Sequence, residues 1–221
     1  MAVKHQEAGS TWNAIGDIEI PFVYSAMAAT PFFDFADSIY PLSDECKLYL
    51  ASVLKTRELS KGNFVLRAEE ICNKIGYIDK GCLKSYSTKA ERESNIWFWF
   101  AGDVVTSTVS FFEQSPSNNY IQAITATRFH YLTHDVLEYA YKAYPETNIL
   151  ARLLLQKYYA LEVKRIELLK GSSAVDRYKF LMEKHPEVLE NVTSKDIASY
   201  LDVSKFRLSQ IRSEIAKSCN S

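Results

Sequence analysis

The feature that most limits the fold is a change in the spacing of apolar residues along the chain. Between Glu58 and Thr133, short runs rich in valine, isoleucine, phenylalanine and tyrosine alternate with turn residues. On either side of this stretch, apolar residues recur every three or four positions, as on one face of a helix. Many short strands separated by turns are typical of an antiparallel barrel or sandwich. The sequence therefore predicts an α+β protein in which helices flank one antiparallel β-barrel.

The runs predicted as strands are NFVLR, KIGYI, CLKSYS, NIWFWF, DVVTS, YIQAIT and RFHYLT, punctuated by Gly62, Gly76, Gly81 and Gly102. Residues 34–145 are assigned to this barrel domain, and residues 34–55 within it are predicted as a leading helix. Residues 1–33 show weak periodicity and are interpreted as an N-terminal extension.

Helical periodicity returns after the barrel. HDVLEYAYKAY is predicted as a short helix, and residues 146–170 as a long one with two apolar stripes. The stripes are Ile149, Leu153, Gln156, Ala160 and Val163, and Leu150, Leu154, Leu161 and Leu168. One stripe can pack on the barrel, and the second favours a twin helix from another subunit. Burial of this helix inside a monomer stays open as the alternative.

Composition and charge indicate an ordinary globular protein and exclude few functions. The chain has 221 residues, of which 47% are hydrophobic and 24% charged, as in ordinary globular proteins. Its four cysteines show no metal-ligand spacing and are interpreted as reduced thiols of a cytoplasmic protein. No membrane span or signal peptide is expected. Residues 1–141 have a net charge of −5 and residues 142–221 a net charge of +4, which points mildly to nucleic acid at the basic end.

The segment VTSKDIASYLDVSKFRLSQIRSEI, within residues 171–221, has the pattern of a helix-turn-helix. Thr193 and Asp196 match a capping box at the start of its first helix. Ala198 supplies the small residue that two closely crossing helices need. Asp202 stands where the turn requires positive φ, a conformation that aspartate tolerates better than most residues. A generic helical hairpin remains the alternative.

The outward face of this unit is rich in hydrogen-bond donors. Arginine and lysine suit phosphates and guanine, and glutamine suits adenine. Phe206 either touches a thymine methyl group or packs on the neighbouring helix, and packing is the preferred interpretation. The predicted DNA-binding residues are Ser194, Lys195, Ser204, Lys205, Arg207, Ser209, Gln210 and Arg212.

The order of barrel, long helix and helix-turn-helix resembles the Crp/Fnr family of bacterial transcription regulators. The stretch ELSKGNFVLRAEEICNKIGYIDKGCLKSYS…NIWFWFAGDVVTS is similar to that family's cyclic-nucleotide-binding domain, and IASYLDVSKFRLSQIRSEI to its DNA-binding end. The resemblance implies a jelly-roll-like barrel, a homodimer paired through residues 146–170, and a two-fold-symmetric DNA operator. RNA polymerase is a further candidate partner. The printed chain ends six residues after Ile215, so little or no β-hairpin wing is expected.

The resemblance also predicts a phosphate-binding cassette, and this sequence departs from it. The family's cyclic-nucleotide binders have glutamate after a glycine and an arginine before a small residue, whereas this chain has Asp103 and Ser117 at those places. No lysine or arginine occurs between Arg92 and Arg128. Without a cation, a cyclic phosphate would lose its charge-assisted hydrogen bonds. Cyclic AMP is therefore not expected as ligand, no cofactor is predicted, and any effector is unidentified. The residues assigned to this degenerate cassette are Gly102, Asp103, Ser110, Ser117, Asn118 and Asn119.

Two other functions compete with that of a dimeric DNA-binding regulator. One is a binding module, in which the barrel and long helix make ligand or protein contacts and the helical end reads no DNA. An enzyme is not expected, because no carboxylate or cysteine is placed to complete a catalytic triad or metal site, and the paired carboxylates Glu69 and Glu70 are interpreted as a solvated turn. His130 and His134 are four residues apart, but Thr133 is predicted to separate a strand from a helix, so the pair does not form a metal site.

Overall fold

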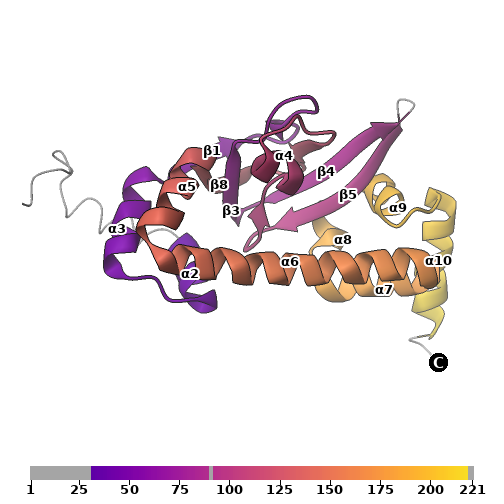
Figure 1. Cartoon of the computed structure of the whole chain (residues 1–221). Helices are drawn as coiled ribbons and strands as arrows, with labels where there is room; N and C mark the ends of the chain where they lie inside the picture. Colours follow the sequence, from indigo (N-terminus) through magenta and orange to yellow (C-terminus); the bar gives the residue numbers. More distant parts are fainter. Residues whose placement is uncertain (1–30, 90–91, 219–221) are drawn as a thin grey trace, which may run out of the picture.

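The computed structural model describes residues 31–89 and 92–218, in which the strands form two four-stranded antiparallel sheets (Figure 1). The sheet orders are β1-β8-β3-β6 and β2-β7-β4-β5. The bounds are β1 Lys55–Leu59, β2 Phe64–Leu66, β3 Lys74–Lys80, β4 Cys82–Lys89, β5 Arg92–Phe100, β6 Val104–Val105, β7 Tyr120–Ala123 and β8 Thr127–Thr133. The antiparallel, jelly-roll-like barrel predicted from the sequence is confirmed.

Alternation along the strands sends one set of side chains into the space between the sheets. On β8, Phe129 is fully buried and its neighbour Arg128 is exposed. Ile78, Leu83 and Ile121 come from three other strands and join Phe129 in one core. Burying a side chain of this size contributes roughly 1.5–3 kcal/mol. This core therefore holds the two sheets face to face.

Gly62, Gly81 and Gly102 have positive φ, and the last two differ in the space around them. Gly81 joins β3 to β4, and so connects one sheet to the other, with φ of 101°. A Cβ at this position would lie 2.5 Å from the carbonyl oxygen of Ala126. Gly102 follows β5 with φ of 92°, but a Cβ there would meet no described atom within 4 Å. At Gly81, a side chain would therefore be disfavoured by the positive φ and by steric clashes. At Gly102, it would be disfavoured by the positive φ alone.

The prediction of a single helix over residues 34–55 is wrong. The structure has two helices, α2 (Pro31–Ile39) and α3 (Asp44–Val53). Pro41 lies between them, where its ring and missing N–H oppose a continuous helix. Ser43 caps α3 by accepting a hydrogen bond from the Cys46 N–H at 3.2 Å. Of the predicted N-terminal extension, residues 1–30 lie outside the described residues, and from Pro31 the chain is helical.

Two further elements were not predicted. Strand β1 pairs with β8 and begins two residues after α3 ends, so Lys55, the last residue assigned to the helix, belongs to the barrel. The segment before Pro116, for which no helix was predicted, contains the short helix α4 (Thr108–Glu113). Both are short, and neither has enough repeats of its apolar pattern to distinguish helix, strand and loop.

The long helix is α6 (Pro145–Gly171), which follows α5 (His134–Ala143) and runs along the barrel (Figure 1). Leu150 is buried and Leu154 partly buried against α2, α3 and α5, and Leu161 packs on the barrel core. One predicted stripe therefore packs within the chain. Large apolar side chains of another face remain exposed, namely Leu155, Tyr159, Val163 and Ile166. Within the described residues, no helix is long and apolar enough to cross a bilayer.

The C-terminal helices are α7 (Ala174–Lys184), α8 (Val188–Asn191), α9 (Ser194–Tyr200) and α10 (Lys205–Ser218). They do not stand apart from the barrel. Cys82, Phe98 and Phe100, on the outer face of β4 and β5, share one buried cluster with Ile197 of α9 and Ile211 of α10. Figure 1 shows α9 lying against β5. The predicted helix-turn-helix thus packs directly on one sheet.

Candidate nucleic-acid interface and effector cavity

The turn between α9 and α10 has the geometry that the sequence predicts. Asp202 has a φ of 54°, in the left-handed region. The Val203 N–H donates to the Ala198 carbonyl oxygen at 3.0 Å, and Ala198 is buried at the helix crossing. Ser204 caps α10, because its Oγ accepts from the Arg207 N–H at 3.1 Å. These contacts fix the angle at which α10 leaves the turn.

The face of α10 that points away from the core carries the side chains predicted to bind DNA. Lys205, Ser209 and Gln210 are exposed, and Leu208 and Ile211 on the opposite face are buried. Ser194 and Lys195, at the start of α9, are also exposed. The preferred interpretation of Phe206 as a packing residue is wrong, because 72% of its surface is exposed.

The two arginines of α10 are less available than the sequence suggests. Arg207 forms an ion pair with Glu214, with 2.7 Å between Nη1 and Oε1. Arg212 donates to Ser194 Oγ at 3.0 Å, and its guanidinium lies 5.9 Å from the centre of the Tyr178 ring. Glu214 was missed at the sequence level, although it lies seven residues after Arg207 and so on the same helix face. Of the predicted cations, Lys195 and Lys205 are the most open to a ligand.

Asp196 has a role that the sequence did not predict. Its carboxylate accepts hydrogen bonds from Lys84 Nζ and Asn95 Nδ2, both at 3.0 Å, and from Thr193 Oγ1 at 2.7 Å. Burial opposes the charge on Asp196, but these hydrogen bonds outweigh it and lower the carboxyl pKa. The backbone N–H of Asp196 still donates to Thr193 Oγ1 at 3.2 Å. The predicted cap is present, and its acidic member also binds the barrel.

Lys84 is the barrel's side of this contact. It lies on β4, is buried, and donates to Glu93 Oε2 at 2.9 Å as well as to Asp196. Burial opposes its charge, but hydrogen bonds to Glu93 and Asp196 prevail and raise the pKa of Lys84. Lys84 and Asp196 are 112 residues apart in the sequence, so no local pattern could have linked them.

A second polar contact lies beside the first. Ser199 Oγ of α9 accepts a hydrogen bond from the Asn95 N–H at 2.9 Å and donates to the Glu93 carbonyl oxygen at 3.1 Å. It therefore satisfies backbone groups on the outer edge of β5, a strand with β4 on its other side. Together with the ion pair, this serine fixes α9 to the barrel in one register.

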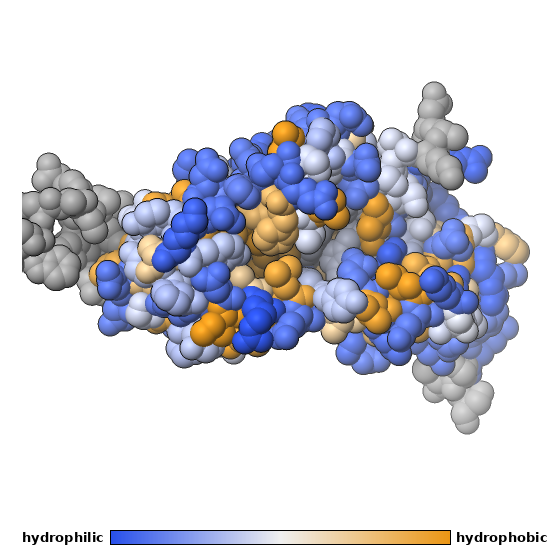
Figure 2. Space-filling view, viewed as in Figure 1, coloured by the Kyte–Doolittle hydropathy of each residue, from blue (hydrophilic) through white to orange (hydrophobic). Residues whose placement is uncertain are grey.

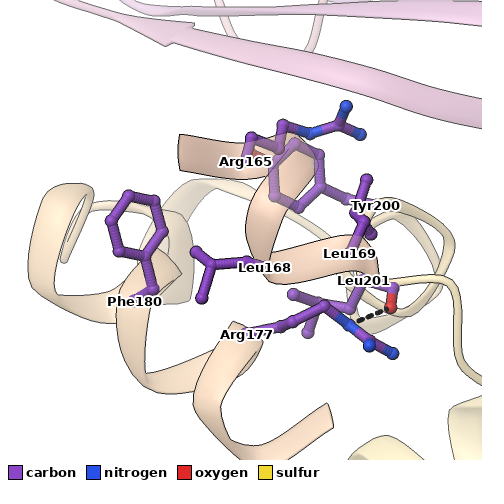
Figure 3. Close-up of a pocket in the computed structure, with 7 residues that line it drawn as sticks. All are labelled: Arg165, Leu168, Leu169, Arg177, Phe180, Tyr200 and Leu201. Carbon is purple, nitrogen blue, oxygen red and sulfur yellow. Dashed lines mark hydrogen bonds between the residues drawn. The ribbon is translucent and has the colours of Figure 1, made fainter. Parts of the chain in front are cut away.

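The end of α6 meets the C-terminal helices at a small cavity of about 20 Å³ (Figure 3). Arg177 donates from Nε to the Leu201 carbonyl oxygen at 3.1 Å and from Nη1 to the Ser172 carbonyl oxygen at 3.0 Å. Arg165 lies over the ring of Tyr200, 4.7 Å from its centre. This space has room for about one water molecule. We interpret it as a small gap in the packing between α6 and the C-terminal helices, too small for a ligand.

Several of the predicted cassette residues make hydrogen bonds to other groups of the chain. Asp103 Oδ2 accepts from the Phe100 N–H at 2.9 Å, and Oδ1 accepts from the Tyr158 hydroxyl of α6 at 3.3 Å. Buried Ser110 accepts from the Cys72 N–H at 2.8 Å and donates to the Ser115 carbonyl oxygen at 2.6 Å. The Asp103 carboxylate and the Ser110 hydroxyl thus stabilise the barrel's own turns.

Ser117, at the expected arginine position, is likewise buried. Its hydroxyl lies 3.2 Å from Ser107 Oγ and accepts from the Asn119 N–H at 3.1 Å. Asn118 is exposed, whereas Asn119 is partly buried and lines a large cavity. Of the six predicted cassette residues, all of them described, Asn119 alone reaches this cavity.

The cavity has a volume of about 960 Å³ and lies between the barrel, α4 and α6. Figure 2 shows its mouth as a hollow with hydrophobic walls between the barrel and α6. Trp97 and Trp99 of β5 and Phe112 of α4 are among its aromatic residues. Among the described residues that line it, the charged ones are Arg152 and Glu162, both on α6. Sequence reasoning missed Arg152, which lies outside the cassette and is brought near only by the fold.

This architecture, a jelly-roll-like barrel followed by a long helix and a helix-turn-helix, is the fold of the Crp/Fnr-type regulators. Among solved structures, the chain is similar to FixK2 from Bradyrhizobium japonicum, with a TM-score of 0.63 and 20% identity over 75% of this chain and 86% of that one. It is also similar to the c-di-GMP responsive global regulator CLP of Xanthomonas campestris, with a TM-score of 0.61 and 11% identity over 80% and 93% of the two chains. The catabolite activator protein of Thermus thermophilus has a TM-score of 0.50 and 15% identity, over 81% and 86%. No protein-family model and no curated protein matches the sequence.

Proposed function

We propose that this protein is a dimeric transcription regulator that places α10 in the major groove of DNA. The observation that carries the proposal is the face formed by Lys205, Ser209 and Gln210. These side chains are exposed, lie on the outer side of a capped helix, and can donate hydrogen bonds to base edges and phosphates. The shared fold with FixK2 and the global regulator CLP supports this assignment.

Dimerisation through α6 is supported by its exposed apolar face. Leu155, Tyr159, Val163 and Ile166 recur at intervals of four, four and three residues, which puts them on one side of the helix. Hydrophobic residues gather along this helix in Figure 2. Pairing two such helices would bury them and relate two copies of α10 by a two-fold axis. The operator would then have two half-sites about one turn of DNA apart.

Replacing Lys195 and Lys205 together by alanine should weaken DNA binding and flatten its dependence on salt. Removing one phosphate contact reduces the steepness of log K against log salt by about 1. The measurement is fluorescence anisotropy at several salt concentrations, with DNA fragments selected from genomic DNA by the wild-type protein. Lys205 and Lys195 are better probes than Arg207 and Arg212, whose guanidinium groups already have protein partners.

The matched control is Lys142→Ala with Lys164→Ala, which removes the same charge from exposed positions on α5 and α6. This control should bind DNA as the wild type does. Equal affinity and slope for all three proteins would contradict DNA reading by this face. The alternative, a ligand- or protein-binding module without DNA readout, would then be the better account.

We propose further that any effector of the barrel is weakly charged and that cyclic AMP is a poor ligand. Ser117 and Asp103 make internal hydrogen bonds, and the cavity walls are largely apolar. Calorimetric titration should therefore show cyclic AMP binding no tighter than adenosine, which lacks the phosphate. Micromolar binding of cyclic AMP with a clear preference over adenosine would contradict this proposal. The regulator CLP, which shares this fold, is described as responsive to c-di-GMP, and this agrees with the fold accepting ligands other than cyclic AMP.

A further inference from the structure

Phe206 is a large apolar side chain in an unusual place. It is the second residue of α10, and 72% of its surface is exposed. The hydrophobic effect favours burying a phenylalanine, and none of the described parts of the chain covers this one. Leu208 and Ile211 of the same helix are fully buried, so the helix has an apolar face to which Phe206 does not belong.

The helix geometry places Phe206 on the face proposed to meet DNA. With about 100° of rotation per residue, Phe206 lies on the side of α10 opposite Leu208. Gln210 follows one turn later on the same side, and Ser209 and Ser213 flank that line. All four are exposed and uncharged. Two cations adjoin Phe206 along the helix: Arg207, which is paired with Glu214, and Lys205 at the start of the helix, where it can reach a phosphate.

The chemistry of the major groove offers one apolar group to such a face. Adenine, guanine and cytosine present hydrogen-bond donors and acceptors at their edges, whereas thymine also presents its C5-methyl group. A phenyl ring makes no hydrogen bond with a base edge, but it can bury a methyl group. We infer that Phe206 is a specificity-determining residue that reads thymine through this methyl group. The inference rests on the proposed function and names one base of its operator.

The test replaces thymine by deoxyuridine, which removes the methyl group and leaves base pairing unchanged. Fragments selected by the wild-type protein give the operator, and each thymine in one half-site is replaced in turn. Anisotropy then measures the affinity of the wild type and of Phe206→Ala for each DNA. Burying one methyl group corresponds to about a fourfold change in affinity. We expect one thymine at which the wild type loses about fourfold and Phe206→Ala loses nothing.

Two further variants sharpen the readout. Leu189 of α8 is 56% exposed but lies on another helix, so Leu189→Ala is expected to keep the full deoxyuridine effect. Phe206→Leu keeps an apolar side chain and should retain part of it. Because Phe206 packs on little, Phe206→Ala is expected to fold, and thermal unfolding checks this. If Phe206→Ala does not fold, the affinities of the wild type and of Phe206→Leu for the deoxyuridine-substituted operators still test the inference.

The possible outcomes separate this inference from the proposed function. A wild-type protein that selects no DNA contradicts the proposed function and this inference with it. A wild-type protein that selects an operator, but shows the same deoxyuridine effect as Phe206→Ala, contradicts the inference alone. The same holds if no thymine in the operator is sensitive to loss of its methyl group, because the exposed ring then serves a protein contact.

Discussion

Replacing Lys84 by methionine is expected to destabilise the protein by about 3 kcal/mol. Removing one member of a buried ion pair leaves the other charge without compensation, which typically costs about 3–5 kcal/mol. Here the side chains of Lys84 and Asp196 are 10% and 11% exposed, and Glu93 is a further partner of the lysine. Urea unfolding followed by tryptophan fluorescence measures the loss. Hydrogen exchange of α9 should show where the structure loosens.

A double variant separates the ion pair from a general packing effect. In Lys84→Met with Asp196→Asn, neither member of the pair is charged, the amide oxygen can still accept from Asn95, and the amide N–H can donate to Thr193 Oγ1. Most of the lost stability should return, giving a coupling energy of at least about 1.5 kcal/mol. Purely additive effects would contradict the role assigned to the pair. Lys164→Met, which breaks an exposed pair with Glu167 on α6, should leave the unfolding midpoint unchanged.

The pKa shifts set the pH range of this effect. Because the pKa of Asp196 is lowered in the folded protein, its contribution is complete above the ordinary value of 3.8 and is lost as pH falls through the folded pKa. The pKa of Lys84 is raised, so its contribution is complete below 10.5 and is lost as pH rises through the folded pKa. The difference between wild type and Lys84→Met should therefore be constant between about pH 4 and pH 10 and shrink outside that range.

Gly81→Ala is the second substitution for which a large effect is expected, with a loss of about 3 kcal/mol. A non-glycine residue at positive φ costs about 1–2 kcal/mol, and crowding of a packed site adds about 1–3 kcal/mol. Both apply at Gly81, whose Cβ would press on Ala126 at the junction of the two sheets. The matched control is Gly102→Ala, where conformation alone opposes the change, so the loss should be about 1–2 kcal/mol. If urea unfolding showed the same loss of stability for Gly81→Ala and Gly102→Ala, the steric contribution assigned to Gly81 would be contradicted.

The sequence predicted those parts of the fold whose signal is local. Short runs rich in β-branched and aromatic residues between turns identified β3, β4 and β5, and caps with a positive-φ aspartate identified the helix-turn-helix. The break at Pro41 was missed because the apolar spacing continues across it. Strand β1 and helix α4 were missed because each is too short to display its period.

The site was predicted less well than the fold, because its geometry depends on contacts between distant segments. Exposure of Lys205 and Gln210 followed from helix periodicity. The partners of Arg207 and Asp196 did not, and neither did the burial of Ser117. From the sequence, a serine hydroxyl in a turn is easily predicted to bind a ligand. In the fold, the hydroxyls of Ser110 and Ser117 instead form hydrogen bonds with backbone groups of the turn.

The shared cluster of Phe98, Phe100 and Ile197 bears on how this protein can be dissected and recombined. A fragment beginning after Gly171 would lack the aromatic surface on which its helices pack, and an isolated barrel would expose that surface to water. Chimeras that exchange the barrel for another must therefore carry over the outer face of β4 and β5. The unit to transfer between proteins is therefore the helix-turn-helix together with the two strands beneath it.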